Sequence, residues 1–534
     1  MTDGRPRPRS DPGGDLLNRD IEAAWRYHNG TKLSWQIVNN VSHYLDWKNK
    51  PTPFKIYPHL EGENLPGDLP SSGVPALAGS PAKAGEFVPT RLDLARLLYF
   101  AAGITKHGVS SEGQIYFRAA ACTGALYHIE IYLVCSDLPD LAAGVYHFGP
   151  HDFALRRLRA GDYRGVLVEA TGDEPAVSAA PAVIVTTSVY WRNSWKSQAR
   201  AYRHAYWDSG TILANLLAVG AANQIPLKVV TAFVDRPVNR LLDLDDQREV
   251  ALQLVPVGLN LGEVIPPPLE VIPLELEVAA YSTLEVEYPA MNEMHTASSV
   301  HSPSEVRELW GNPPKIQDPK PLDNLFPLEP ANETELPTDS IEAVILRRGS
   351  SRRFRRTPIT HRQLSTILDQ ASRNIPADFL YGSGDIPRDG SIQALTQLYL
   401  IVQDVEGLPS GSYVYQQERA ALEQLKLGNF RERSGYLGLQ QALASDASVN
   451  AFFLTDLAAV LERYGNRGYR MAQVEAGIRG GGLYLGAYAQ RLGASGLTFL
   501  DDDVTEFFSP HANGKSVLFF VALGRPQRGP RQQR

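Results

Sequence analysis

The chain has 534 residues, of which 43% are hydrophobic and 21% are charged, and its formal net charge is −7. This weak acidity gives no electrostatic reason to expect nucleic-acid binding, and no apolar run approaches the roughly 20 residues that span a bilayer. The only cysteines, Cys122 and Cys135, argue against a disulfide framework. We therefore expect a cytoplasmic protein of roughly two to four domains, with no membrane or nucleic-acid partner.

The first half of the chain predicts an α+β unit. Residues 1–15 are rich in Pro, Gly and Arg and predict a disordered arm. An amphipathic helix is expected where apolar residues recur at helical spacing, at Leu94, Leu97, Leu98 and Ala101. The further elements predicted in this half are strands over 129–135, 183–189 and 251–258 and a long helix over 201–222.

The second half predicts a similar series of elements after a break. Residues 266–337 are dense in proline and acidic residues and predict a connector. A short helix should follow over 339–346, with Asp339 and Glu342 at the spacing of a capping box. The elements expected next are a helix containing Leu364, Ile367, Leu368 and Ala371, strands over 395–403, 451–457 and 516–524, a long helix over 469–492, and a flexible tail over 527–534.

A repeat of the whole unit is visible at an offset of half the chain length, because Tyr202-Arg203 recurs as Tyr469-Arg470. The register extends over about 130 residues. The sequence therefore predicts two fused copies of one domain, 16–265 and 338–526, each with a mostly antiparallel sheet flanked by helices. Two fused copies usually rebuild a homodimer, so we expect a monomeric intrachain pseudo-dimer, or a higher assembly of it, with a ligand site at the internal interface.

Residues 347–353 combine four arginines, two serines and one glycine. Because the planar fork of arginine matches two phosphate oxygens at once, this stretch predicts a phosphate receptor. The same composition also fits a solvated basic loop, and the spacing alone leaves both interpretations open.

Motifs in both copies resemble known flavoenzymes. The second copy contains Arg348-x-Ser350-x-Arg352-x-Phe354 and ends its last strand at Gly524. It resembles the FMN-dependent nitroreductase fold, whose members open with an Arg-Arg-Ser-x-Arg phosphate clamp. The first copy is similar to the SagB-type dehydrogenases, which use FMN to oxidise thiazolines and oxazolines in modified peptides. The segments that carry this second resemblance are Tyr27-His28-x-x-Thr31-Lys32, Leu45-Asp46-Trp47, Pro53-Phe54-Lys55-x-Tyr57-Pro58, Gly124-Ala125-Leu126-Tyr127-x-x-Glu130-x-Tyr132 and Arg200-Ala201-Tyr202-Arg203-His204.

The nitroreductase resemblance implies one composite FMN site. In the positions aligned with the clamp, the first copy has Pro81, Lys83 and Gly85. Conversely, Arg118 to Gly124 aligns with the family's Arg-x-x-Pro-Ser-x-Gly, where the second copy has Asp385 and Ser391. Backbone at 496–498 would face the N5 edge of the ring, and Arg118 its N1 and O2 edge. The residues expected around FMN are Arg347, Arg348, Ser350, Arg352, Arg118, Cys122, Thr123, Gly124, Gly496, Leu497, Thr498 and Arg525.

The catalytic groups are expected in two different copies. SagB-type enzymes carry a Lys-Tyr pair ahead of Arg-Ala-Tyr-Arg as acid and base, and this chain keeps Lys196 in one copy and Tyr464 in the other. Lys196 would need a pKa lowered by burial or by nearby cations. The alternatives are a solvated Lys196, an inert buried Cys122 and a salt-bridging Arg118.

The expected activity is FMN-dependent oxidation of a thiazoline- or oxazoline-like C–N substrate, either small or carried by a peptide, with oxygen or another acceptor reoxidising the flavin. An NAD(P)H-dependent nitro or quinone reductase would use the same flavin in the opposite direction. A third possibility is a flavin-binding partner protein without activity, because the Pro-Ser and Lys-Tyr pairs are incomplete. The chain has no His-Glu-x-x-His, Cys-x-x-Cys, serine elbow or dinucleotide fingerprint, so its motifs predict no metal site.

Overall fold

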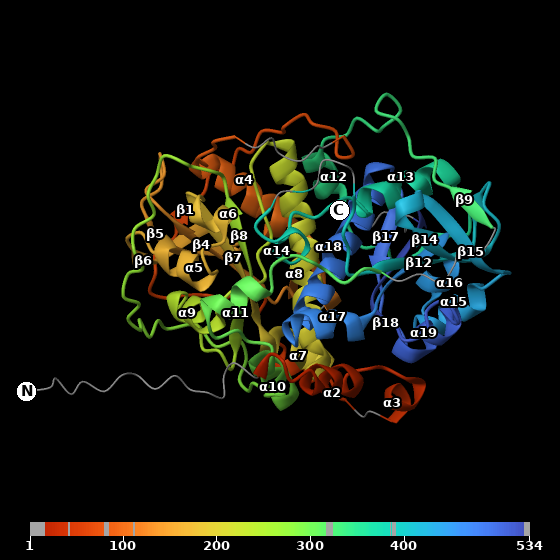
Figure 1. Ribbon diagram of the computed structural model, residues 1–534, viewed down its shortest axis with the longest axis horizontal. Coiled ribbons are helices and arrows are strands. Elements are labelled where there is room, and N and C mark those ends of the chain that lie inside the picture. Colours follow the sequence, from red (N-terminus) through yellow and green to blue (C-terminus); the bar gives the residue numbers. More distant parts are fainter. Residues whose placement is uncertain are drawn as a thin grey trace, which may run out of the picture.

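Two antiparallel sheets lie at opposite sides of the molecule, and two long helices run between them (Figure 1). The structure, a computed structural model, describes residues 17–40, 43–78, 85–110, 113–316, 324–384, 386 and 391–527. The predicted arm at 1–15, nearly all of the predicted tail, and Pro81, Lys83 and Asp385 lie outside the described residues.

The first sheet has six strands in the order β1-β6-β5-β4-β7-β8. Its central strand is buried along its whole length, as expected for a nearly continuous apolar run with both faces covered. The strands are β1 (Glu63–Asn64), β4 (Ile129–Cys135), β5 (Gly144–Gly149), β6 (Ala154–Ala160), β7 (Ala182–Val189) and β8 (Glu249–Val257), and a separate hairpin joins β2 (Ile104–Ser110) to β3 (Gly113–Arg118).

The helices α4, α5, α6 and α9 lie around this sheet, whereas α2 and α3 lie against the second half (Figure 1). The predicted helix around Leu94 begins at a capping box formed by Thr90 and Asp93. The helices are α2 (Glu22–Gly30), α3 (Trp35–Asn40), α4 (Arg91–Ala102), α5 (Arg164–Ala170), α6 (Pro175–Ser178), α7 (Tyr190–Ser197), α8 (Ala201–Ala222) and α9 (Asp235–Leu241).

The second sheet has eight strands in the order β10-β18-β16-β12-β14-β15-β9, with β17 paired to β18. The strand expected over 451–457 ends at Thr455, because Asp456 caps the next helix by accepting a hydrogen bond from the amide of Ala459. The strands are β9 (Leu325–Pro327), β10 (Phe354–Arg355), β12 (Gln397–Val402), β14 (Gly411–Gln416), β15 (Ala421–Leu427), β16 (Val449–Thr455), β17 (Gly493–Gly496) and β18 (Ser516–Pro526), and β11 (Ile359–Thr360) pairs separately with β13 (Val405–Glu406).

The five main strands follow the same order in both sheets. The order β6-β5-β4-β7-β8 corresponds to β15-β14-β12-β16-β18, and Tyr132 of β4 and Tyr399 of β12 are separated by the repeat offset. Each half therefore has the mixed architecture of helices and an antiparallel sheet that the sequence predicts. The helices of the second half are α12 (Ile341–Arg347), α13 (His361–Ala371), α14 (Asp378–Tyr381), α15 (Arg431–Leu437), α16 (Ala442–Asp446), α17 (Leu457–Tyr464), α18 (Arg467–Ala489) and α19 (Asp501–Phe508).

The two long helices, α8 and α18, cross at a pair of glycines. A Cβ atom on Gly210 would lie 2.7 Å from the Cα of Gly477, and one on Gly477 would lie 2.6 Å from the carbonyl oxygen of Trp207. Only glycine permits this approach of the two backbones. Since Gly210 and Gly477 are also separated by the repeat offset, the crossing joins corresponding positions of the two halves.

Ion pairs across this interface are reciprocal. Asp501 accepts hydrogen bonds from Arg203 at 2.7 Å and from Arg200 at 3.0 Å. In the other direction, Asp235 accepts hydrogen bonds from both Arg470, at 2.6 Å, and Arg467, at 2.8 Å. Each arginine pair therefore binds an aspartate of the opposite half, which is the exchange that a two-fold axis produces in a homodimer.

The segment expected as a connector contains helices α10 (Pro289–Ala297) and α11 (Pro303–Glu308). The first residues of α2 and α10 are separated by the repeat offset. The carbonyl oxygen of His28 accepts a hydrogen bond from Arg203, and that of His295 accepts one from Arg470. Residues 289–308 thus occupy the places that the N-terminal helices have in the first half. Composition concealed this relation, because the segment is rich in proline and its side chains differ from those of α2.

The start of α12 also differs from the prediction. Its N-cap is Ser340, whose hydroxyl accepts from the amide of Ala343, so Asp339 does not form the capping box. Glu342 instead accepts hydrogen bonds from the serines at 71 and 72, which belong to the first half.

Among the helices that the structure describes, none combines the length and apolar character needed to cross a bilayer.

Candidate active site

Arg348 connects the arginine-rich stretch to the first half. It follows α12 and is 7% exposed. Its Nε donates to the carbonyl oxygen of Ala119 at 2.7 Å, and its Nη2 donates to that of Arg118 at 2.9 Å. The predicted clamp and the predicted Arg118–Gly124 segment are therefore in direct contact. Two donors of Arg348 are used for this contact, so the residue joins the halves in addition to adding positive charge.

The other members of the stretch divide into two groups. Arg347 is held internally, by an ion pair with Asp339 at 2.9 Å and a hydrogen bond to the carbonyl oxygen of Tyr488 at 2.7 Å. Arg352 and Ser350 are exposed, and no described residue forms an ion pair with Arg352. Of the four residues predicted to form the clamp, Arg352 and Ser350 are therefore exposed, and the adjacent Arg353 is exposed as well.

Lys106 adds a cation beside the clamp that the motifs did not indicate. Its Nζ donates to the carbonyl oxygen of Arg348 at 2.7 Å and to that of Arg347 at 3.2 Å. Burial, and secondly the charge of Arg348, lowers the pKa of the Lys106 ammonium.

Tyr484 joins the clamp to the predicted loop 496–498. Its hydroxyl accepts a hydrogen bond from the amide of Gly496 at 2.5 Å and lies 3.3 Å from the Oγ of Ser350. Thr498 is exposed, and the amide of Leu497 donates to the carbonyl oxygen of Phe520 at 3.1 Å. No motif indicated Tyr484, but its counterpart in the first copy is Leu217, and that difference between the halves was readable in the sequence.

Arg118 is buried, and its guanidinium group faces the first half. It donates to the carbonyl oxygens of Pro53 at 2.9 Å and Ile129 at 3.4 Å, and it lies over the rings of Phe54 and Tyr127. Its Nε has no partner among the described residues. Burial lowers the pKa of Arg118, against the opposing effect of Glu130. The alternative of a surface salt bridge is not what the structure shows.

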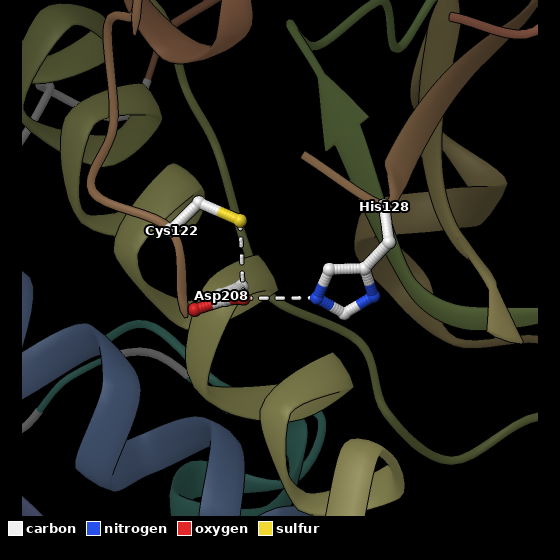
Figure 2. A group of neighbouring side chains, drawn as sticks. All are labelled: Cys122, His128 and Asp208. Carbon is white, nitrogen blue, oxygen red and sulfur yellow. Dashed lines mark hydrogen bonds and ion pairs between the residues drawn. The ribbon is translucent and has the colours of Figure 1, made fainter. Parts of the chain in front are cut away.

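Cys122, Thr123 and Gly124 form a turn that Asp208 holds in place. Both the amide and the hydroxyl of Thr123 donate to Asp208 Oδ1 at 2.9 Å, and the Cys122 thiol donates to Oδ2 at 3.2 Å (Figure 2). Gly124 has a φ of 64°, in the left-handed region that favours glycine. The Cys122 side chain is therefore not an inert apolar group, because its thiol is hydrogen-bonded to Asp208.

The structure does not bring Lys196 and Tyr464 into a common site. Lys196 is exposed at the end of α7, where its Cδ lies 3.5 Å from the position of a Cβ on Gly124. Tyr464 is fully buried, and its hydroxyl donates to the carbonyl oxygens of Phe379 at 2.7 Å and Gly311 at 3.0 Å. Burial raises the pKa of Tyr464. Its hydroxyl therefore binds two backbone carbonyl groups inside the fold, whereas Lys196 is exposed.

Arg525 binds the backbone of the segment that follows β10. It lies on β18 opposite Arg355, and its Nε donates to the carbonyl oxygen of Pro358 at 2.8 Å. Its guanidinium group is thus used to hold the short segment between β10 and β11, and the expected contribution to phosphate binding has no support in this arrangement.

His204 is a functional candidate that the sequence did not single out. Its Nδ1 lies 2.7 Å from the Oδ1 of Asn193, whose Nδ2 points to the carbonyl oxygen of Thr123 at 3.5 Å. This orientation of the amide assigns the ring proton to Nδ1 and leaves a lone pair on Nε2. Burial, and secondly Arg200, lowers the pKa of His204 well below its usual range. The imidazole of His204 is therefore neutral at neutral pH, with its lone pair on Nε2.

His204 lies between the two segments of the predicted site. On one side Asn193 connects it to Thr123, and on the other its ring lies 4.9 Å from that of Trp207, which is 5.5 Å from the ring of Phe519. A Cβ on Gly496 would lie 3.7 Å from Phe519. The signal for His204 in the sequence is its position directly after the Arg-Ala-Tyr-Arg motif.

The pH dependence of stability should report the neutral state of His204. Because its pKa is lowered on folding, the unfolded chain binds the proton first as the pH falls below about 6.5, so stability is lost in that direction. The slope for this one group is at most about 1.4 kcal/mol per pH unit. In His204→Gln, the free energies of unfolding measured by urea denaturation at pH 7 and pH 5 should differ less than in the wild type. His59→Gln, at an exposed position, is the control, and equal slopes for His204→Gln and the wild type would contradict the assignment.

Comparisons with known proteins agree on one family. The sequence profile of the nitroreductase family matches residues 345–525. A Methanocaldococcus jannaschii protein named "Putative nitroreductase MJ1384" is 27% identical over 169 residues, which make up 32% of this chain and 80% of that protein. A crystal structure titled "a putative nitroreductase" from Anabaena variabilis superposes with a TM-score of 0.75 at 26% identity, covering 95% of this chain and 99% of that chain. The second half of this chain therefore contains a nitroreductase-family domain, and the chain as a whole has a nitroreductase-like fold.

Proposed function

We propose that this protein is an FMN-dependent oxidoreductase that holds one FMN in a composite site between its halves, with a dehydrogenase activity of the SagB type. The observation that carries the proposal is the contact of Arg348 with the carbonyl oxygens of Arg118 and Ala119. It brings the phosphate-binding chemistry of the second half next to the segment of the first half that resembles the family's flavin-contacting motif.

The side chains at this contact fit an anionic cofactor. Arg352 and Ser350 are exposed, Lys106 is adjacent, and the ion pairs of the described residues leave Arg352 without a carboxylate partner. These groups would hold the phosphate, while the turn at Cys122–Gly124 and the backbone near Gly496 would hold the ring. A bound FMN would supply the acceptor for two electrons. Arg525 and Arg347 have no part in this proposal, because other groups already bind them.

We further propose that the chain is a tandem duplication. The reciprocal pairs of Asp501 and Asp235, the crossing of Gly210 and Gly477 and the shared strand order all support an intrachain pseudo-dimer. The first unit spans about residues 16–265. The second would begin with α10 and not at residue 338, because α10 lies at the repeat offset from α2. A single chain would then be sufficient for function.

The second, symmetry-related site is covered by the chain itself, which supports a single flavin. Val229 and Thr231 are the counterparts of Gly496 and Thr498 in the repeat register, yet they are buried where those residues are exposed. The amide of Val229 donates to the carbonyl oxygen of Pro376 at 2.7 Å. The amide and hydroxyl of Thr231 donate to the carboxylate of Asp378 at 2.9 and 3.0 Å. Segment 376–378 therefore binds the backbone of Val229 and Thr231, whereas the corresponding residues of the proposed site, Gly496 and Thr498, are exposed.

For the direction of the reaction, we favour substrate oxidation with His204 as the proton acceptor. Removing hydrogen from a C–N substrate requires a base, and the Nε2 lone pair of His204 is available between the two flavin-binding segments. Lys196, exposed beside Gly124, is a second candidate base on the solvent side. A thiazoline- or oxazoline-like group on a peptide is the substrate class that the SagB resemblance suggests.

Flavin stoichiometry tests the proposed site. Purified protein should show the visible absorption of a flavin, either as isolated or after addition of FMN, and it should bind one FMN per chain. Absorption spectra of gel-filtered protein, with the protein concentration from amino-acid analysis, give the ratio. A colourless protein after FMN addition would overturn the flavoenzyme proposal, and a ratio near two would overturn the single site.

The direction of electron flow needs a separate experiment. Anaerobic mixing of the FMN-loaded protein with NADH or NADPH should leave the flavin band unchanged if the protein is a dehydrogenase. Rapid bleaching would instead identify a nitro or quinone reductase. Dithionite serves as the positive control, because it reduces an accessible flavin in either case.

A further inference from the structure

Cys122, His128 and Asp208 converge from three elements of the first half (Figure 2). Cys122 precedes the 3-10 turn at Thr123–Ala125, His128 directly precedes β4, and Asp208 lies on α8. The Sγ of Cys122 is 3.2 Å and the Nε2 of His128 is 2.9 Å from the same oxygen, Oδ2 of Asp208. The three candidate ligand atoms all lie within 4.8 Å of one another.

Asp208 differs from its counterpart in the second half in how its charge is neutralised. That counterpart, Glu475, is also buried and pairs with Arg479 at 2.5 Å. The residue of the first half that corresponds to Arg479 is Ile212. Among the described residues, the ion pair of Asp208 is with His128, and its other donors are the thiol of Cys122 and groups of Thr123. A buried carboxylate is normally paired with a cation or bound to a metal. Arg479 is that cation for Glu475 in the second half, whereas Ile212 at the corresponding position carries no charge that could pair with Asp208.

The groups around the cluster already orient the three side chains. Ser188 Oγ lies 2.9 Å from the Nδ1 of His128, and Thr123 holds the second oxygen of Asp208 through its amide and hydroxyl. The amide of Tyr127 donates to the sulfur of Cys122 at 3.1 Å. Hydrogen-bonded supports of this kind are what fixes ligand geometry in metal sites.

A small cavity of about 10 Å³ lies beside the cluster, with Cys122, Asp208 and Arg118 in its wall. This is about the space that one water molecule requires. Arg118 belongs to this wall, and its Nε has no partner among the described residues. A water ligand here would complete four-coordination and could accept a hydrogen bond from Arg118.

We propose that Cys122, His128 and Asp208 bind one divalent transition-metal ion, with Zn²⁺ as the best match, and that a water is the fourth ligand. Thiolate, imidazole and carboxylate are the ligand types that Zn²⁺ takes, at roughly 2.0–2.3 Å, which places neighbouring ligand atoms about 3.2–3.7 Å apart. The separations of 2.9 and 3.2 Å from the Oδ2 of Asp208 lie within a few tenths of an ångström of this range, and the sulfur of Cys122 lies within 4.8 Å of the Nε2 of His128.

Binding would release the thiol proton of Cys122, and the remaining imidazole proton of His128 would reside on Nδ1 and be donated to Ser188. The ion would neutralise the charge of Asp208 and hold the turn at Cys122–Gly124 in place through its bond to Cys122. This role does not depend on the proposed oxidoreductase function. The sequence motifs did not indicate the site, because Asp208 is distant in sequence from the other two ligands and Cys-x5-His is not a common spacing of zinc ligands.

Metal titration of chelator-treated, full-length protein tests the proposal. Co²⁺ should bind with one ion per chain and produce a thiolate-to-cobalt charge-transfer band, and Zn²⁺ should displace it. In Cys122→Ser, which keeps a hydroxyl donor for Asp208, the band should be lost and the Zn²⁺ affinity should fall by at least about 100-fold. His128→Gln should have the same effect, so the test survives if one of the two variants fails to fold.

Cys135→Ala is the matched control, because Cys135 is the other cysteine and is buried in β4. It should bind Co²⁺ as the wild type does. Absence of stoichiometric binding by the wild type would overturn the proposal. Binding that is unchanged in folded Cys122→Ser and His128→Gln would equally overturn it, because the ion would then lie elsewhere.

Discussion

Replacing Asp501 by alanine should lower the free energy of unfolding by about 3–5 kcal/mol. The carboxylate is 2% exposed and accepts hydrogen bonds from Arg200, Arg203 and the amide of Leu33. Without it, two buried guanidinium groups lose their counter-charge, and burial of an unpaired charge is the main cost. Urea denaturation followed by circular dichroism measures the change.

The neighbouring residue provides a matched control. Asp502 is 77% exposed and pairs with Lys32 at 2.7 Å, so Asp502→Ala should change the free energy of unfolding by about 1 kcal/mol or less. Similar losses for Asp501→Ala and Asp502→Ala would contradict the buried, charge-paired role of Asp501.

The reciprocal position should respond in the same way. Asp235→Ala removes the partner of Arg467 and Arg470 and should cost about as much as Asp501→Ala. Burial alone would raise the pKa of Asp235, but the two arginines hold it well below its usual range. This stabilisation is therefore present above pH of about 4 and is lost as the pH falls further. A small effect at one aspartate and a large one at the other would contradict the two-fold arrangement.

Arg352→Ala should raise the dissociation constant of FMN by about 10- to 100-fold, as expected for the loss of one charge-assisted contact with the phosphate. Arg352 is exposed and no described residue pairs with it, so the substitution should leave the stability of the protein nearly unchanged. Fluorescence titration of the flavin-free protein with FMN measures the affinity.

Two variants separate a phosphate contact from a general effect of charge. Lys32→Ala removes a cation that pairs with Asp502, and Arg353→Ala removes the exposed neighbour of Arg352. Both should bind FMN nearly as the wild type does. Equal weakening in all three variants would indicate long-range attraction only, and no weakening in Arg352→Ala would contradict the clamp.

Sequence patterns were most informative where local periodicity reports burial. The spacing of Leu94, Leu97, Leu98 and Ala101 predicted α4, and apolar runs predicted β4 and α8 with their observed bounds. These elements are determined by which faces are apolar, and that property is local. The composition of residues 289–308 did not indicate α10 and α11, because these helices are short and their stability comes from packing against other elements rather than from propensity.

The site shows the same difference between what the local sequence indicates and what the tertiary structure decides. The residue types of the clamp and the turn at Cys122–Gly124 suggested the chemistry, but not the direction of each side chain. Tyr464 and Arg525 belong to motif-like positions, yet their donors bind the carbonyl oxygens of Phe379 and Pro358. The role of His204 as a candidate base depends on its contact with Asn193, which orients the imidazole ring.

By itself, the sequence determined the α+β class of each half and the cationic chemistry of residues 347–353 and predicted a repeat, because each depends on the order and spacing of residues along the chain. Only the tertiary structure decided that Arg348 reaches the backbone of Arg118 and Ala119 and that segment 376–378 binds the amides of Val229 and Thr231. It also brought Cys122, His128 and Asp208 together. Such contacts depend on how two sheets and two long helices pack, and distant residues carry no local signal of their pairing.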